Sequence, residues 1–136
     1  MTEFQPIVPV FFDAKINSVT VESGHTLLPT TIINVSEPWS IRVNFETSGF
    51  FAPLLLGNFE VTAFYEGMGT APEGSFLPVA VGAAPAGPKA ALVAVGAAAL
   101  PVGTYKLVVT VTHKVGAAPT GIAGYFEAGM VQIVAP

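Results

Sequence analysis

Few side chains in this sequence could act as nucleophiles, acids, bases or metal ligands. The chain has two histidines, His25 and His113, and nine acidic residues, of which Asp13 is the only aspartate. It has no cysteine, so a thiolate nucleophile, a disulfide and a cysteine zinc site are excluded. Catalysis by side chains needs a nucleophile, acid or base together with a partner that tunes it. This inventory predicts that the protein is not an enzyme.

The spacing of the remaining polar residues does not predict a metal site or a catalytic triad. Glu22 and His25 are three residues apart, but the residues between them indicate a turn and no second pair follows. Protein zinc sites usually need three or four converging ligands, so we expect no metal. His113, Asp13 and a serine could form a triad, yet no nucleophile-elbow motif accompanies them. We expect His113 to be the polar end of a strand, where the strand meets water.

Cofactor-binding loops are also missing from the sequence. Gly67 and Gly69 are not followed by the third glycine of a dinucleotide-binding loop. The sequence has neither the Gly-Lys-Ser/Thr of a phosphate-binding loop nor an aspartate-rich calcium loop. We therefore expect no cofactor.

The low charge content limits the choice of partners. Charged residues make up 10% of the chain and hydrophobic residues 51%, whereas about 25% of an ordinary soluble domain is charged. The five basic residues are scattered along the chain: Lys15, Arg42, Lys89, Lys106 and Lys114. They cannot form the basic stripe that phosphate backbones require, so nucleic acid is not an expected partner. So little charge also predicts that part of the surface is either rich in Thr, Ser and Gly or covered by other chains.

Alternation of apolar and polar residues with period two predicts β-strands throughout the chain and no helix. The strongest predicted strand is 104–113, and the strand at 39–46 divides cleanly into an apolar and a polar face. The strand at 58–66 does the same, except that Phe64 falls on its outer face. The other predicted strands are 15–22, 30–35, 75–81, 90–95 and 124–134, the last with a bulge near Gly129. Together they predict one all-β domain over residues 1–136.

One segment resembles a known class of module. Residues 100–112, LPVGTYKLVVTVT, are similar to the penultimate strand of many bacterial immunoglobulin-like modules. In such modules a tyrosine after a Pro/Gly turn bonds back to the corner before its strand. The resemblance implies an immunoglobulin-like antiparallel β-sandwich of about 7–9 strands, in which Tyr105 forms this tyrosine corner. Trp39 opens an early strand, whereas antibody domains place their tryptophan in the third strand, opposite a disulfide that this chain lacks.

Two segments are more apolar than free loops usually are. Residues 1–12 form an extended apolar arm or an edge strand, because Pro6 and Pro9 lack the N–H groups that a central strand needs. Such an arm either folds back along its own sheet or adds to the edge of a neighbouring copy. Residues 50–56 form either a buried crossover or an exposed patch. The candidate interaction residues are Phe4, Ile7, Val8, Val10, Phe11, Phe12, Phe50, Phe51, Leu54, Leu55 and Leu56.

These features favour a non-enzymatic structural or interaction module that self-associates with its own copies into an oligomer or filament. The alternative hypothesis is a sandwich that binds a small molecule or carbohydrate, with Trp39, Tyr65 or Tyr125 stacked on a sugar ring. Rings in such strands more often belong to the core.

The sequence gives little information about location. No targeting signal is visible, and the longest apolar run, 90–103, is shorter than the ~20 residues of a membrane-spanning helix. We expect no membrane span and, by default, a cytoplasmic location, with extracellular assembly as the alternative.

Overall fold

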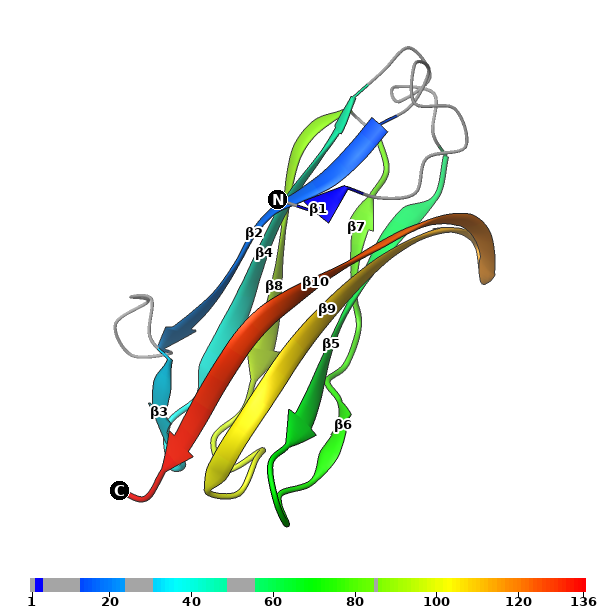
Figure 1. Cartoon of the computed structure of the whole chain (residues 1–136). Coiled ribbons are helices and arrows are strands. Elements are labelled where there is room, and N and C mark those ends of the chain that lie inside the picture. The colour runs from blue at the N-terminus through cyan, green and yellow to red at the C-terminus, as the bar shows by residue number, and fades with distance from the viewer. Residues whose placement is uncertain (1, 4–12, 24–30, 49–55, 85) are drawn as a thin grey trace.

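The computed structural model describes residues 2–3, 13–23, 31–48, 56–84 and 86–136. Within these ranges the chain forms ten strands in two sheets and no helix (Figure 1). One sheet has the order β1 (Thr2–Glu3), β2 (Asp13–Ser23), β4 (Trp39–Ser48), β8 (Gly87–Val95). The other has the order β3 (Ile32–Asn34), β10 (Ala118–Val134), β9 (Gly103–Val115), β5 (Asn58–Gly67), β6 (Glu73–Ser75), and β7 (Val79–Gly82) also pairs with β5.

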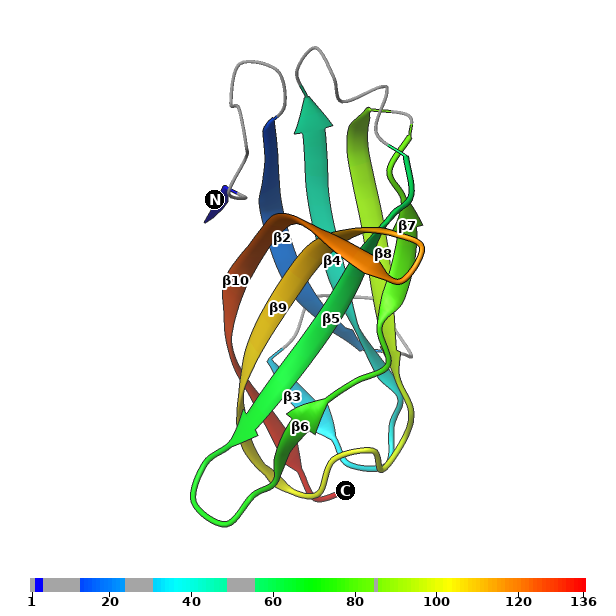
Figure 2. The ribbon, with the colours of Figure 1, turned by 90° about the vertical axis from the view of Figure 1, so that its right-hand side faces the viewer.

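The two sheets lie face to face with the apolar core between them (Figure 2). Neighbouring strands in the described ranges are antiparallel, except that the end of β10 pairs in parallel with β3. The predicted class, an all-β immunoglobulin-like sandwich, is confirmed.

The alternating patterns form strands because each strand buries one face and leaves the other in water. All four inward residues predicted for β4, namely Trp39, Ile41, Val43 and Phe45, are buried. On β9 every second residue from Tyr105 to His113 is buried, and these side chains pack against the opposite sheet. Burial of one Val, Leu, Ile or Phe side chain stabilises a fold by about 1.5–3 kcal/mol. The two strands therefore provide much of the core.

Strand β9 is central to the six-stranded sheet. It pairs with β5 from Tyr105 to Lys114 and with β10 from Gly103 to Val115. The β10 ladder shifts register between Glu127 and Gly129, and Gly129 has a φ of +88°. A bulge of this kind needs a residue that tolerates positive φ, and glycine does so without steric cost. The predicted bulge is confirmed.

One predicted strand is wrong in its extent. Residues 75–81 do not form a continuous strand: β6 ends at Ser75 and β7 begins at Val79, and both pair with β5. Pro78 has no N–H to donate to a ladder, and it directly precedes β7. The Phe76 N–H still donates to Ala63 O at 2.9 Å, so this edge stays attached to β5 through the interruption.

The described part of the N-terminal segment belongs to its own sheet. Thr2 lies opposite Ile16 and Glu3 lies opposite Lys15 in the antiparallel ladder between β1 and β2. β1 is therefore an edge strand of the four-stranded sheet, and residues 4–12 lie outside the described ranges.

Tyr105 joins the start of β9 to the preceding turn. Its side chain is fully buried, and its hydroxyl donates to Pro101 O at 2.7 Å. This is the bond expected for a tyrosine corner. Burial, and secondarily Tyr65, raise the pKa of Tyr105 above its usual value.

Replacing Tyr105 by phenylalanine should destabilise the fold. The Tyr105→Phe change removes only the hydroxyl and leaves Pro101 O without its donor, which costs about 1–3 kcal/mol. Tyr65→Phe is the matched control, because the Tyr65 hydroxyl has no hydrogen bond within the described residues. Urea denaturation of the two variants measures the difference in free energy of unfolding. Equal losses would contradict the importance of this corner.

The same tyrosine should make the fold sensitive to alkali. An unfolded tyrosine ionises near pH 10, whereas the raised pKa of Tyr105 keeps its proton in the folded state at higher pH. The unfolded chain then binds fewer protons than the folded chain, so stability falls as pH rises above about 10. Denaturation at increasing pH should show a steeper loss in the wild type than in Tyr105→Phe. Parallel slopes would be the contrary result.

Candidate functional site

The three aromatic candidates for ligand stacking differ in accessibility. Trp39 is only 4% exposed, and its ring meets Phe76 edge-on with centroids 5.8 Å apart. Tyr65 is half-buried between Phe76 and Tyr105, with ring centroids at 4.9 Å and 6.0 Å. Tyr125 is 60% exposed on the outer face of β10. The Trp39 ring is therefore part of the core, and Tyr125 is the candidate whose ring is open to solvent.

Most of the predicted interaction residues lie outside the described ranges. These are Phe4, Ile7, Val8, Val10, Phe11, Phe12, Phe50, Phe51, Leu54 and Leu55. Leu56 is described, and its side chain is largely exposed at the entrance to β5.

His113 is not the solvated strand end that the sequence suggested. It is buried, its Nε2 donates to Leu56 O at 2.6 Å, and its Nδ1 lies 2.7 Å from Thr120 Oγ1. The Phe59 ring lies beside it, with centroids 5.2 Å apart. The strand continues to Val115 and turns back as β10, which brings Thr120 over the imidazole. His113 thus ties the β9–β10 hairpin to the segment that enters β5.

The glutamates provide ion pairs rather than a metal site in the described part of the chain. No three His, Asp or Glu residues there lie close enough together to hold a metal ion. Glu22 is buried and accepts two hydrogen bonds from Arg42, at 2.9 Å and 3.2 Å. These contacts raise the pKa of Arg42 above its usual value. Three other glutamates pair with lysines, as Lys15–Glu46, Lys106–Glu127 and Lys114–Glu60.

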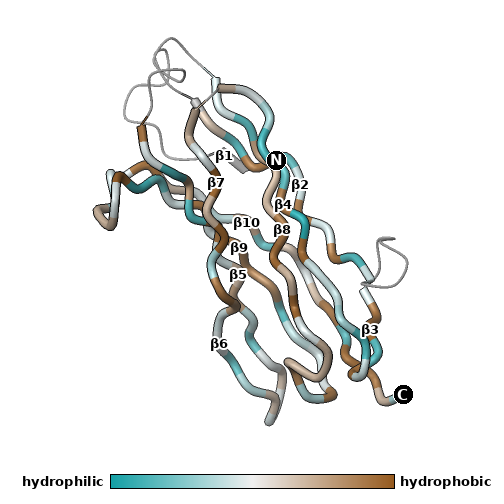
Figure 3. The backbone as a smooth tube through the Cα atoms, turned by 180° about the vertical axis from the view of Figure 1, so that it is seen from behind, coloured by the Kyte–Doolittle hydropathy of each residue, from teal (hydrophilic) through white to brown (hydrophobic). Residues whose placement is uncertain are grey.

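The first candidate surface is the outer edge of the four-stranded sheet. Strand β8 ends this sheet, and within the described ranges its ladder partner is β4. Its outward side chains Ala90, Leu92 and Ala94 are exposed, with Leu92 at 43%. Brown and pale colours run along most of β8, beside the alternating teal of β2 and β4 (Figure 3). The edge is therefore apolar.

Charge on β8 is confined to one end. Lys89 lies near the start of the strand, where burial lowers its pKa below the usual value. From Ala90 to Gly103 the sequence has no charged residue. The uncharged run was visible in the sequence, but its position at a sheet edge depends on strand order, which local patterns do not encode.

The second candidate surface is a shallow depression of about 550 Å³ on the outer face of the six-stranded sheet, where β5, β6 and β9 meet. Phe64, 43% exposed, lies opposite Ser75 on β6, and Glu66 lies opposite Glu73. Its lining includes Phe64, Tyr65, Glu66, Glu73, Ser75 and Lys106. In the sequence, Phe64 was the one residue that broke the alternation of its strand. An aromatic residue at an outward position indicates an apolar spot on the outer face of the sheet.

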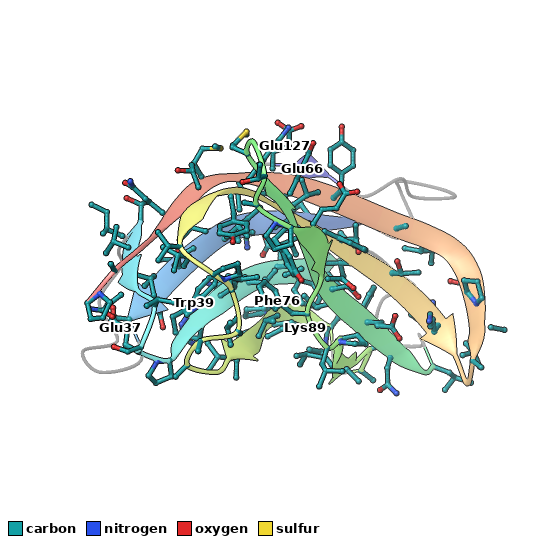
Figure 4. The ribbon with its side chains drawn as sticks, turned by 90° about the horizontal axis from the view of Figure 1, so that it is seen from below. Glu37, Trp39, Glu66, Phe76, Lys89 and Glu127 are labelled. Atoms are coloured by element: carbon teal, nitrogen blue, oxygen red, sulfur yellow. The ribbon has the colours of Figure 1, made fainter. Side chains whose placement is uncertain are left out.

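The surroundings of the depression are acidic. Lys106 lies opposite Glu66 on β5, and its Nζ is 3.6 Å from the Glu127 carboxylate. Glu66 and Glu127 lie on the outer side of the arched sheet, away from Trp39 and Phe76 (Figure 4). Tyr125 belongs to the same face and lies two residues before Glu127 on β10, whereas Glu127 is in register with Val108 on β9 and Phe64 on β5.

No family model and no curated protein sequence matches this chain. Among solved structures it is similar to the C-terminal domain of wzt, with a TM-score of 0.62 and 8% identity over 90% of this chain and 74% of that one. It is also similar to the CARDB domain of the PF1109 protein from Pyrococcus furiosus, whose structure is a complex with di-metal ions. There the TM-score is 0.50 and the identity 16%, over 93% of this chain and 97% of that one. These likenesses show the fold alone.

The structure also determines what the single tryptophan should report in solution. Because Trp39 is buried, its fluorescence should resist quenching by iodide and acrylamide in the native state and become sensitive after unfolding in urea. Stern–Volmer constants in the two states measure this difference. Equal constants would mean that the indole is exposed, and Trp39 would then return as a stacking candidate.

Proposed function

We propose that this protein is a non-enzymatic structural or interaction module that self-associates into an oligomer or filament. The observation that carries the proposal is the position of β8 at the end of the four-stranded sheet, with Leu92 exposed and charge confined to Lys89 near the start of the strand. An edge strand presents unpaired N–H and C=O groups, and proteins usually block such edges with lysine, proline, bulges or a covering segment. On β8, Pro88 and Lys89 stand only at the first end, and the rest of the strand has no such residue.

The side chains of β8 suit close approach by a second chain. The outward positions Ala90 and Ala94 are small, and Leu92 between them supplies apolar area that water does not favour. A second strand laid along this edge would satisfy its free backbone groups and bury these side chains. The low charge of the whole chain weakens the electrostatic repulsion that would keep copies apart. A second β8 is the proposed occupant, because each copy offers the same edge.

The segments 4–12 and 50–56 are the further proposed contacts. Their apolar composition supports this role, and Leu56 presents an exposed apolar side chain at the end of the second segment.

A charge placed on the β8 edge should weaken assembly. Leu92→Lys puts an ammonium group at the middle of the edge, where pairing would have to desolvate it. The free energy of unfolding should change by no more than about 0.5 kcal/mol, because the side chain is exposed. Light scattering over a range of protein concentrations should show a mass above 14.0 kDa for the wild type and a mass closer to that of one chain for the variant.

Leu77→Lys is the matched control for this experiment, because it makes the same change at an 87% exposed leucine between β6 and β7. It should assemble as the wild type does. Deletion of residues 1–12 provides a second test and should also bring the measured mass closer to that of one chain. A wild type that is strictly monomeric, or equal disruption by both lysine variants, would overturn the β8 proposal.

Carbohydrate binding is a second candidate function. It is favoured by the exposed ring of Tyr125 and by the exposed ring of Phe64 on the same face. Aromatic rings that are exposed on the surface of a sheet can stack against the C–H face of a sugar, whereas buried rings such as that of Trp39 cannot.

A further inference from the structure

The depression between β5, β6 and β9 combines an apolar wall with free polar groups. Phe64 forms the apolar wall and has Val108 as its neighbour on β9. Tyr65 belongs to the lining through its place between Phe64 and Glu66, whereas its ring packs inward against Phe76 and Tyr105 and its hydroxyl lies close to Gly74. A Cβ at position 74 would come within 2.7 Å of that hydroxyl. The glycine therefore leaves room for the Tyr65 hydroxyl beside β6.

Two carboxylates at this site have no partner within the described residues. Glu66 and Glu73 face each other directly in the β5–β6 ladder, and neither forms a hydrogen bond or ion pair there. Like charges directly opposite on a sheet are destabilising. Ionised carboxylates accept hydrogen bonds only, so both glutamates offer acceptor oxygens beside the Phe64 ring. Ser75, opposite Phe64, adds a hydroxyl that can donate or accept.

The charge of the surroundings narrows the class of ligand. Glu66, Glu73 and Glu127 outnumber Lys106, and Lys106 is already paired with Glu127. A ligand with carboxylate, sulfate or phosphate groups would be repelled here. A ligand with many hydroxyl donors and one apolar face matches the acceptor oxygens and the ring together.

We propose that this depression binds an uncharged saccharide, with one sugar ring against Phe64 and its hydroxyls donating to Glu66 and Glu73. The inference rests on the second candidate function and specifies its site and ligand class. Few but convergent polar groups beside an apolar wall are typical of small-ligand sites.

The same face extends the site toward Tyr125. Phe64 and Tyr125 are two strands apart and one outward row apart in the paired ladders, a separation of about 12 Å from ordinary sheet spacings. A single sugar ring is too short to contact both aromatic rings. The occupant is therefore an oligosaccharide, which follows the face from β6 across β9 to β10.

The test is a titration of the whole chain with uncharged hexasaccharides, cellohexaose, maltohexaose and mannohexaose, followed by NMR chemical shifts. At least one should bind saturably and shift the amide signals of Phe64, Tyr65 and Ser75. Phe64→Ala should weaken that binding by about tenfold, the effect of losing one ring contact. Glu66→Gln should weaken it about threefold, because a neutral amide is a poorer acceptor.

Three controls keep the result specific. Leu77→Ala removes an exposed apolar side chain outside the depression and should leave the affinity unchanged. Oligogalacturonate tests an acidic saccharide, and tetralysine tests a cationic peptide; neither should compete with the hexasaccharide. Circular dichroism checks that each variant is folded.

The proposal is overturned if no uncharged hexasaccharide binds, if oligogalacturonate binds more tightly, or if tetralysine binds the same residues with no loss in Phe64→Ala. A hexasaccharide whose binding is lost in Tyr125→Ala but kept in Phe64→Ala would overturn this site and leave carbohydrate binding standing. Loss of assembly in Leu92→Lys bears on neither result, because that residue lies on the other sheet.

Discussion

The burial of one face of β9 is the constraint on which the rest of the sandwich depends. Its inward side chains from Tyr105 to His113 pack into the core, and its backbone pairs with β5 on one side and β10 on the other. The strand is held at both ends, by the Tyr105 hydroxyl on Pro101 and by the His113 imidazole on Leu56. With the inner face thus occupied, the outward side chains of these three strands, such as Phe64 and Tyr125, are the ones exposed to solvent.

Sequence periodicity predicted much of this fold because strand faces repeat every two residues. Local alternation predicted the inward residues of β4 and the long strand β9. Glycine's tolerance of positive φ predicted the bulge at Gly129. The interruption between β6 and β7 was missed because the apolar pattern continues through Phe76 and Leu77 although Pro78 cannot pair.

The candidate surfaces were harder to predict because they depend on long-range pairing. The position of β8 at an edge, and that of Glu66 opposite Glu73, arise only when distant strands align. The burial of His113 depends in the same way on the hairpin that folds Thr120 back over it. Phe64 is the exception among these residues, because an aromatic side chain at a polar position of an alternating strand can be recognised from the sequence alone. The two candidate surfaces lie on different sheets, so a ligand on one does not occupy the other.

The position of β8 at one end of its sheet also limits the symmetry of an assembly. When two copies pair their β8 strands antiparallel, the contact is isologous, and each copy's edge is fully used by the other. Growth then stops at a closed dimer. At the opposite end of the sheet, β2 presents polar residues and is partly covered by β1. A further copy is therefore not expected to add at that end. A filament of this chain therefore requires a second, heterologous surface besides β8.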